Sequence, residues 1–225
     1  MNLQGKVVVI TGSASGLGLA LAHSATAAGG IVVVSGNDKD AVANAAVNMN
    51  AYGIAADVTD EAQLEALKRE CIDKFGGIDV WINNAGTWIP HGPIEAIDMA
   101  RLQQMMEVNL YGTINGVKVA LRLMREQGSG IIVNILSTDV LTGKAGSAAY
   151  CATKSAAAGF TKSLQLEVQG SGIAALAVYP GAMQTDLFDE KKPENFDSYM
   201  DPAKVAEAII NNLKEDQPNP ELIIQ

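Results

Sequence analysis

The chain has 225 residues, of which 48% are apolar and 18% charged, and it carries a formal net charge of −9 with a pI near 4.7. This length is sufficient for one domain with a sizeable core, and the apolar content excludes an intrinsically disordered protein. The acidic balance disfavours a nucleic-acid-binding or anionic-membrane-binding surface, so we expect no nucleic acid and no membrane as a partner.

The sequence also argues against a membrane-spanning, secreted or metal-binding protein. No apolar run reaches the roughly 18 residues of a membrane span. The polar start Met1–Lys6 leads directly into a strand-like run, so we expect no signal peptide. Cys71 and Cys151 are too few for a disulfide framework, which fits a reducing, cytoplasmic location. Neither histidine nor cysteine shows metal-ligand spacing, so we expect no metal.

Short apolar runs alternate along the chain with helix-like segments. The runs expected to form strands are Lys6–Thr11, Ile31–Ser35, Ile54–Val58, Ile78–Asn83, Ile131–Leu136, Ile173–Tyr179 and Leu222–Ile224. The segments expected to form helices are Leu17–Ala28, Asp38–Met49, Asp60–Phe75, Asp98–Arg125, Ala148–Gln169 and Pro202–Leu213. Because the runs are apolar on both faces, they are typical of parallel strands that are covered on both sides. The alternation therefore predicts an α/β fold, a doubly wound sheet flanked by helices, as a single domain over residues 1–225.

A glycine-rich turn follows the first predicted strand and opens directly into a helix. In this turn Gly12 would make the tight bend, Gly16 would admit a phosphate and Gly18 would let the helix approach the strand. Backbone N–H groups at such a helix N-terminus are suited to bind a pyrophosphate. Taken alone, the cluster is also compatible with an ordinary turn between a strand and a helix.

Tyr150 and Lys154 share one face of a predicted helix, since they are four residues apart. An ammonium beside a phenol favours the phenolate, so we expect Lys154 to lower the pKa of Tyr150. Ser137 stands at the end of the fifth predicted strand, and strand ends are where open α/β sheets bind ligands. As an isolated pattern, the tyrosine–lysine pair also occurs by chance on many helices.

Two asparagine motifs and three aromatic or imidazole side chains are further candidates. The run Asn83–Gly86 ends the fourth predicted strand, and Asn109 lies inside the long predicted helix. Because asparagine is unfavourable in a helix interior, Asn109 indicates either a solvent-facing position or a local distortion of the helix. Trp81 is expected in the core, whereas Trp88 and His91 are candidates for the wall of a substrate pocket, with an ordinary loop position as the alternative.

The order of these motifs along the chain is that of the short-chain dehydrogenase/reductase family, which the sequence resembles from Leu3 to about Asp186. The positions that carry the resemblance are Thr11, Gly12, Gly16, Gly18, Asp57, Asn83, Asn84, Ala85, Gly86, Asn109, Ser137, Tyr150, Lys154, Pro180, Gly181 and Thr185. The resemblance implies a Rossmann-like, seven-stranded parallel sheet, a nicotinamide cofactor, and hydride transfer between that cofactor and a small-molecule alcohol or carbonyl.

The resemblance also implies a role for each matching residue. Ser137 would donate a hydrogen bond to the substrate oxygen, Tyr150 would transfer the proton, and Lys154 would bond the nicotinamide ribose. Asn109 would hold a water that connects Lys154 to solvent. The cofactor contacts implied are Gly12, Ser13, Ser15, Gly16, Leu17, Gly18, Gly36, Asn37, Asp57, Val58, Asn84, Ala85, Gly86, Tyr150, Lys154, Pro180, Gly181 and Thr185.

Four of these positions bear on the identity of the cofactor. The resemblance places Asp57 at the adenine amino group and Thr185 at the nicotinamide carboxamide. At the end of the second strand, where an acid would favour NAD(H), the sequence has Gly36 followed by Asn37. We therefore expect NADP(H) to be preferred by about tenfold, with NAD(H) also usable.

The remaining expectations concern the substrate lid and the assembly. The segment 182–200, where the family has its lid, is short and polar here, which suggests an open pocket. The family commonly assembles through two long helices, which correspond here to 98–125 and 148–169. Small residues in Ala156–Gly159 would allow a close approach, so we expect a homodimer or homotetramer.

A different class of function must be weighed against the enzyme. The same fold could serve as a non-catalytic dinucleotide-binding sensor or scaffold, because a fold alone does not determine function. The discriminating feature is the presence of all four polar residues that the chemistry needs, which favours the enzyme: Asn109, Ser137, Tyr150 and Lys154.

Overall fold

A seven-stranded sheet in the order β3-β2-β1-β4-β5-β6-β7 forms the centre of the computed structural model, which describes residues 1–225. The strands are β1 (Val7–Thr11), β2 (Ile31–Ser35), β3 (Tyr52–Gly53), β4 (Val80–Asn83), β5 (Gly130–Ile135), β6 (Ile173–Pro180) and β7 (Glu221–Ile224). Every neighbouring pair is parallel. The chain order reverses between β1 and β4, the place where such sheets bind ligands. The predicted doubly wound parallel sheet is confirmed.

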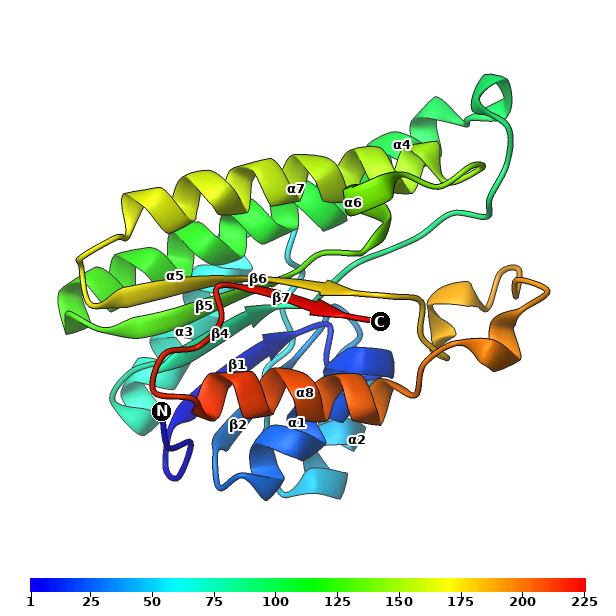
Figure 1. Ribbon diagram of the computed structural model, residues 1–225. Coiled ribbons are helices and arrows are strands. Elements are labelled where there is room, and N and C mark those ends of the chain that lie inside the picture. The colour runs from blue at the N-terminus through cyan, green and yellow to red at the C-terminus, as the bar shows by residue number, and fades with distance from the viewer.

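Helices cover both faces of this sheet (Figure 1). They are α1 (Gly16–Ala27), α2 (Lys39–Met49), α3 (Glu61–Phe75), α4 (Met99–Met106), α5 (Thr113–Gln127), α6 (Asp139–Thr142), α7 (Ala148–Glu167) and α8 (Pro202–Lys214). Helices α1, α2 and α8 pack on one face, and α3, α5 and α7 pack on the other. None of the helices is long and apolar enough to cross a bilayer.

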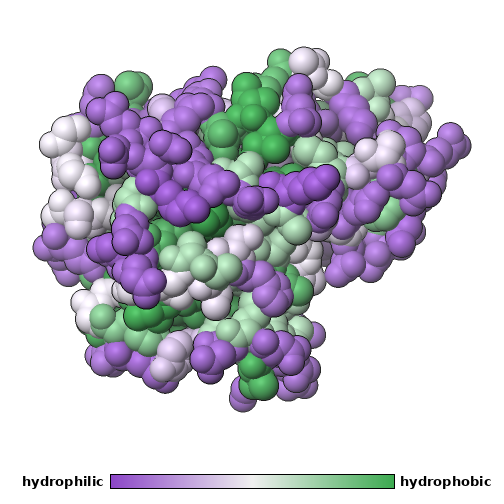
Figure 2. Space-filling model, turned by 60° about the horizontal axis from the view of Figure 1, so that its bottom comes forward, coloured by the Kyte–Doolittle hydropathy of each residue, from purple (hydrophilic) through white to green (hydrophobic).

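The apolar strands are explained by burial on both faces. In β1, Val8 and Ile10 join the core beneath α1 and α8, while Val7 and Val9 join the core beneath α3 and α5. Trp81 on β4 is fully buried, as predicted. The outer side of the helices is different: on the face that carries α1, α2 and α8, hydrophilic residues surround the apolar ones (Figure 2).

Two predicted elements differ from those observed. The third strand is only Tyr52–Gly53, not Ile54–Val58. Ala56 and Val58 are buried against the core under α3, so the apolar alternation of this segment reflects packing without a strand ladder. The single helix expected over 98–125 is interrupted by a π-helical segment, Glu107–Gly112, which separates α4 from α5. The π-helical segment contains the buried Asn109, so of the two alternatives for this residue the local distortion is the one observed.

Candidate active site

The carboxyl ends of β1, β2, β4, β5 and β6 open onto one cleft of about 680 Å³. Each of these strands is followed directly by a residue that lines the cleft: Gly12, Gly36, Asn84, Leu136 and Gly181. Figure 1 shows the segment 182–200 at the same edge of the sheet. Side chains from distant parts of the sequence therefore meet at this edge.

The structure brings nearly all of the predicted site residues to the wall of this cleft. Those that line it are Gly12, Ser15, Gly16, Leu17, Gly18, Gly36, Asn37, Asp57, Val58, Asn84, Ala85, Gly86, Ser137, Tyr150, Lys154, Pro180, Gly181 and Thr185. Ser13 is the correction among the cofactor contacts. Its buried hydroxyl donates to the Ile10 carbonyl at 2.6 Å and accepts the Ser35 N–H at 2.9 Å. Ser13 therefore joins β1 to β2 and does not line the cleft.

The glycine turn after β1 leaves the N-terminus of α1 available to an anion. Gly12 (φ +61°) and Gly16 (φ +52°) adopt left-handed conformations, and a side chain at Gly18 would overlap the Gly12 carbonyl. No side chain caps α1, and its first turn has no acidic residue, whereas aspartates cap α2, α3, α4 and α8. The free N–H groups of this turn fit the pyrophosphate of a dinucleotide.

The turn after β4 is hydrogen-bonded to the end of β1 and to the glycine turn. Asn84 Nδ2 donates to the carbonyls of Thr11 and Gly12 at 3.0 and 2.9 Å. Thr11 Oγ1 in return accepts the N–H groups of Asn84 and Ala85, each at 3.1 Å. A Cβ on Gly12 would lie 2.7 Å from the Ala85 Cα, so the two turns are in close contact. The Asn84 side chain thus holds the glycine turn in shape, while the segment itself lines the cleft.

Tyr150 and Lys154 lie one turn apart on α7, and both reach the cleft. Lys154 Nζ donates to the Ile135 carbonyl at 2.9 Å and lies 5.9 Å from the centre of the Tyr150 ring. Burial lowers the pKa of Lys154 to about 8. Burial, reinforced by the Asp139 carboxylate, raises the pKa of Tyr150, and a hydrogen bond with Ser137 offsets only part of this rise. The expected lowering of the Tyr150 pKa by Lys154 is therefore wrong for the protein alone, because burial dominates and Lys154 is not among the groups that shift this pKa.

The hydroxyl group of Ser137 can donate its hydrogen to a ligand. Its Oγ accepts the backbone N–H of Asp139 at 3.1 Å, which leaves the hydroxyl hydrogen available for donation. Ser137 also lowers the pKa of Tyr150, although burial raises it more. Both side chains line the same cleft, so together they could bind a single oxygen atom of a ligand.

Asn109 lies behind the cleft and does not line it. Its Oδ1 accepts the Thr87 N–H at 2.8 Å, and its Nδ2 donates to the Thr87 carbonyl and to Thr153 Oγ1, each at 3.0 Å. A Cβ on Gly86 would lie 3.3 Å from Asn109 Oδ1 and 3.5 Å from Lys154 Nζ, so the amide and the ammonium both border Gly86. The observed contacts make Asn109 a tie between the loop after β4 and α7.

The segment 182–200 covers the cleft with an aromatic side chain. Phe188 packs edge-on against Trp88 with a centroid distance of 5.0 Å, and both side chains are only 8% exposed and line the cleft. His91 also lines the cleft and packs against Trp88 at 5.3 Å. Arg101 on α4 holds the segment by hydrogen bonds to both carboxylate oxygens of Glu190, at 2.9 and 2.5 Å. The segment thus contributes an apolar side chain, Phe188, to the cleft, which its polar composition did not indicate.

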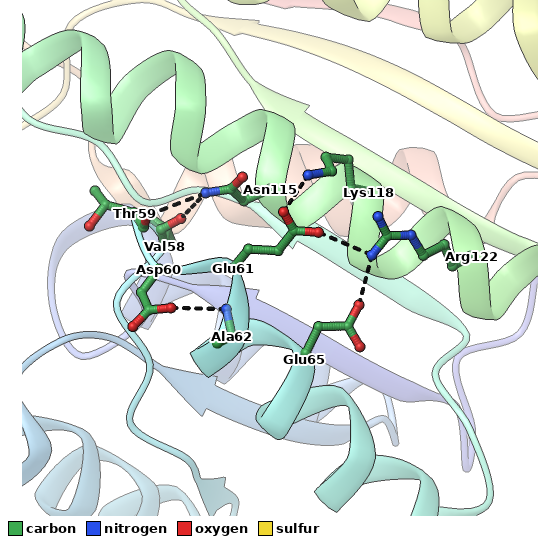
Figure 3. A network of polar contacts seen from close by, with 9 residues as sticks. All are labelled: Val58, Thr59, Asp60, Glu61, Ala62, Glu65, Asn115, Lys118 and Arg122. Atoms are coloured by element: carbon green, nitrogen blue, oxygen red, sulfur yellow. Dashed lines mark hydrogen bonds and ion pairs between the residues drawn. The ribbon is translucent and has the colours of Figure 1, made fainter.

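Asn115 is a functional candidate that the sequence did not single out. Its amide, on α5, donates to the carbonyl of Val58 at 3.0 Å and more weakly to that of Thr59 at 3.5 Å (Figure 3). Val58 and Thr59 line the end of the cleft where a cofactor adenine is expected. The same helix is joined to α3 by ion pairs of Glu61 with Lys118 and Arg122. An asparagine in a helix interior was the available signal, as it was for Asn109.

Replacing Asn115 with alanine is expected to raise the dissociation constant for a nicotinamide cofactor by about tenfold, because the Val58 carbonyl loses its partner and the loop loses its position. The turnover number at saturating cofactor should change less than about twofold, since Asn115 does not touch the catalytic residues. Fluorescence titration and steady-state kinetics measure the two quantities. Arg122→Ala, which removes only exposed ion pairs from the same helix, is the control and should alter neither. A change in turnover with unchanged cofactor affinity would contradict this role.

Comparison with known proteins places the chain in a well-populated group. A family model described as short chain dehydrogenase matches residues 6–195. The chain is 36% identical over 216 residues to levodione reductase from Leifsonia aquatica, covering 91% of this chain and 79% of that protein. It is 37% identical to cis-4-hydroxycyclohexanecarboxylate dehydrogenase from Sinomonas cyclohexanicum, over 81% of this chain and 75% of that protein.

A solved structure extends the comparison to the fold. The 3-ketoacyl-(acyl-carrier-protein) reductase from Brucella melitensis, in its complex with NADH, superposes with a TM-score of 0.91 at 28% identity. The match covers 99% of this chain and 97% of that one.

Proposed function

Because the chain belongs to the short-chain dehydrogenase/reductase family of oxidoreductases, we propose that it is an NAD(P)-dependent enzyme that interconverts a small-molecule alcohol and carbonyl. The observation that carries the proposal is that Ser137, Tyr150 and the buried Lys154 line one cleft, which begins at the glycine turn. The relatives named above as a reductase and a dehydrogenase support the same reaction class.

The cleft offers a binding surface along its whole length for a nicotinamide dinucleotide. The free N–H groups at the start of α1 would hold the pyrophosphate, Asp57 the adenine, and Thr185 the nicotinamide amide. The related structure with bound NADH supports this class of cofactor. When bound, the cofactor supplies or accepts the hydride.

The protein's own residues handle the proton and the developing charge. Ser137, whose Oγ already accepts the Asp139 N–H, would donate its hydrogen to the substrate oxygen, where negative charge builds up in carbonyl reduction. Tyr150 has a raised pKa and is therefore protonated at neutral pH, as a proton donor must be. Lys154 would bond the nicotinamide ribose. Asn109 would complete the relay by holding a water beside Lys154, a role supported by the fact that both side chains border Gly86.

A non-catalytic dinucleotide-binding sensor or scaffold remains the alternative from another class. A binding protein has no need for a lysine buried so deeply that its pKa falls to about 8, because burial of a charge is costly. The deciding experiment is a panel of ketones and secondary alcohols assayed by nicotinamide absorbance with both cofactors. Turnover of at least one pair supports the enzyme, and cofactor binding without turnover across the panel supports the sensor.

We propose a modest preference for NADP(H), of about tenfold in kcat/KM, or about 1.4 kcal/mol. Gly36, at the end of β2, places no carboxylate against a 2′-phosphate, and Asn37 beside it can donate hydrogen bonds. The nearby Asp38 limits the preference, although one oxygen of its carboxylate is occupied by the N-terminus of α2. Steady-state kinetics with both reduced cofactors and one saturating ketone measure the ratio, and Asn37→Arg should widen it. An NADH value equal to or above the NADPH value contradicts the preference.

We further propose a homodimer or homotetramer formed through α5 and α7, in the cytoplasm. Two of the small residues of α7, Ala157 and Ala158, are buried inside the protein. Gly159 instead faces open space, since a Cβ on it would meet no atom within 4 Å. Leu166 on the same helix is 74% exposed. Light scattering should give a multiple of the 23.5 kDa chain mass, and Gly159→Arg should shift it to the monomer. A monomeric wild type at micromolar concentration contradicts the proposal.

A further inference from the structure

The substrate end of the cleft has an apolar wall. Trp88 and Phe188 form its edge-to-face aromatic pair, and Met183 and Leu187 line the cleft beside Phe188. The free energy of binding at such a wall comes from the apolar surface that the ligand buries against it. A ligand that fits here presents a compact hydrocarbon body next to the oxygen held by Ser137 and Tyr150.

One carboxylate faces this end of the cleft without a partner. Asp139 lines the cleft, and its carboxylate forms neither an ion pair nor a hydrogen bond, in contrast to Asp38, Asp57 and Asp60. Its backbone is fixed, because its N–H donates to Ser137 Oγ and its carbonyl accepts from Gly143 N. The Asp139 side chain therefore starts from a fixed backbone position next to Ser137, whose hydroxyl would bind the reacting oxygen.

The influence of Asp139 reaches the groups around the reacting atoms. Besides burial, which acts more strongly, its carboxylate raises the pKa of Tyr150 and of Tyr199. Burial and Lys144 lower the pKa of His91, and Asp139 opposes both effects. His91 is thus mainly neutral at pH 7 and does not compensate the carboxylate.

The cations near this end of the cleft are poorly placed to neutralise the negative charge of Asp139. Lys144 lines the cleft but is exposed, so water and salt screen its charge. Lys154 Nζ is directed to the Ile135 carbonyl, on the side where the ribose would lie. A second carboxylate, that of Asp186, also lines the cleft. A negatively charged group on a substrate would therefore meet negative charge near the reacting oxygen.

We propose that the substrate is an uncharged ketone or secondary alcohol with a compact apolar body, and that Asp139 is a specificity-determining residue that excludes carboxylate-bearing analogues. This inference rests on the function proposed above. Repulsion between like charges in a partly desolvated cleft acts on the anionic analogue alone, since the hydrocarbon wall serves both molecules equally. The chemistry of the wall favours an alicyclic ring as the compact body, since a ring buries apolar surface at little cost in conformational entropy.

A matched pair of ketones tests the proposal. Cyclohexanone and 3-oxocyclohexanecarboxylate differ by one carboxylate, and the neutral ketone is expected to have a kcat/KM at least tenfold higher. Asp139→Asn keeps the size and the backbone contacts of the side chain but removes its charge, so it should narrow the ratio at least fivefold by improving the anionic ketone. Raising the ionic strength should narrow the ratio in the wild type and have less effect in the variant. Asp189→Asn, an exposed acid on the segment 182–200 that does not line the cleft, is the control and should leave the ratio unchanged.

The outcomes separate this inference from the proposed function. Turnover of both ketones at similar kcat/KM, a preference for the carboxylate, or an unchanged ratio in Asp139→Asn overturns the inference and leaves the oxidoreductase proposal standing. Absence of turnover for this pair, when other ketones of the panel are reduced, overturns the inference as well. Absence of turnover across the whole panel overturns both. Thermal unfolding of each variant establishes that the comparison is made between folded proteins.

Discussion

Tyr150→Phe is expected to lower the turnover number for ketone reduction by about a thousandfold, within the range that a general acid contributes. The phenol lines the cleft together with Ser137, and its raised pKa keeps it protonated at neutral pH, as a proton donor must be. Phenylalanine retains the ring that packs in α7, so the dissociation constant for the cofactor should change less than about threefold. Stopped-flow kinetics and a cofactor titration measure the two effects separately.

A second tyrosine provides the control for this substitution. Tyr179 on β6 is buried in the core and does not line the cleft, so Tyr179→Phe removes a phenol without removing the proton donor. Its turnover number should stay within about twofold of the wild type. If Tyr150→Phe also retained most of its activity, the assignment of the proton donor would be wrong.

Lys154→Ala is expected to reduce both the turnover number and the affinity for the cofactor, the first by about a hundredfold and the second by about tenfold. The ammonium serves two partners, since it lies beside Tyr150 and on the wall where a ribose would bind. Lys154→Met fills the same space without the charge and should show both losses, which separates the lost ammonium from a lost packing contact. Lys162→Ala, on the exposed side of the same helix, is the control. A loss confined to either quantity contradicts the double role.

The same lysine gives a pH dependence of stability with a definite sign. The pKa of Lys154 is about 8 in the folded protein, against 10.5 for an unperturbed lysine. Between these values the unfolded chain holds a proton that the folded protein has released, so raising the pH favours the folded state. The free energy of unfolding should therefore contain a term that rises from pH 8 towards pH 10.5, by up to about 3 kcal/mol. Denaturant unfolding of wild type and Lys154→Met between pH 7.5 and 9.5 measures it, because the variant lacks this rise.

Much of the fold follows from local rules that the sequence carries openly. Runs such as those of β1 and β2 are apolar on both faces, and only strands covered on both sides use them. Asp38, Asp60, Asp98 and Asp201 mark helix starts, and each caps its helix. The glycine turn and the tyrosine–lysine spacing are likewise local, because each depends on the geometry of one turn or one helix face.

The positions of the site residues relative to one another depend on tertiary contacts. The inward rotation of Ser13 depends on the neighbouring strand β2, and the shortening of β3 depends on the packing of Ala56 and Val58 under α3. The role of Asn115 depends on a loop 57 residues away in the chain. Contacts between residues of different elements produce no periodic pattern in the sequence, so they could not be predicted from it.

The sequence by itself determined that this protein has a parallel α/β fold with a dinucleotide-type turn, because these features arise from neighbouring residues, and its resemblance to a family implied the oxidoreductase class. The tertiary structure alone decided the electrostatics and the shape of the site. Burial, which no spacing reveals, reverses the expected effect on Tyr150, and Phe188 reaches Trp88 only through the folded segment 182–200. Desolvation and long-range packing are properties of the assembled cleft, so they appear only when strands distant in sequence end side by side.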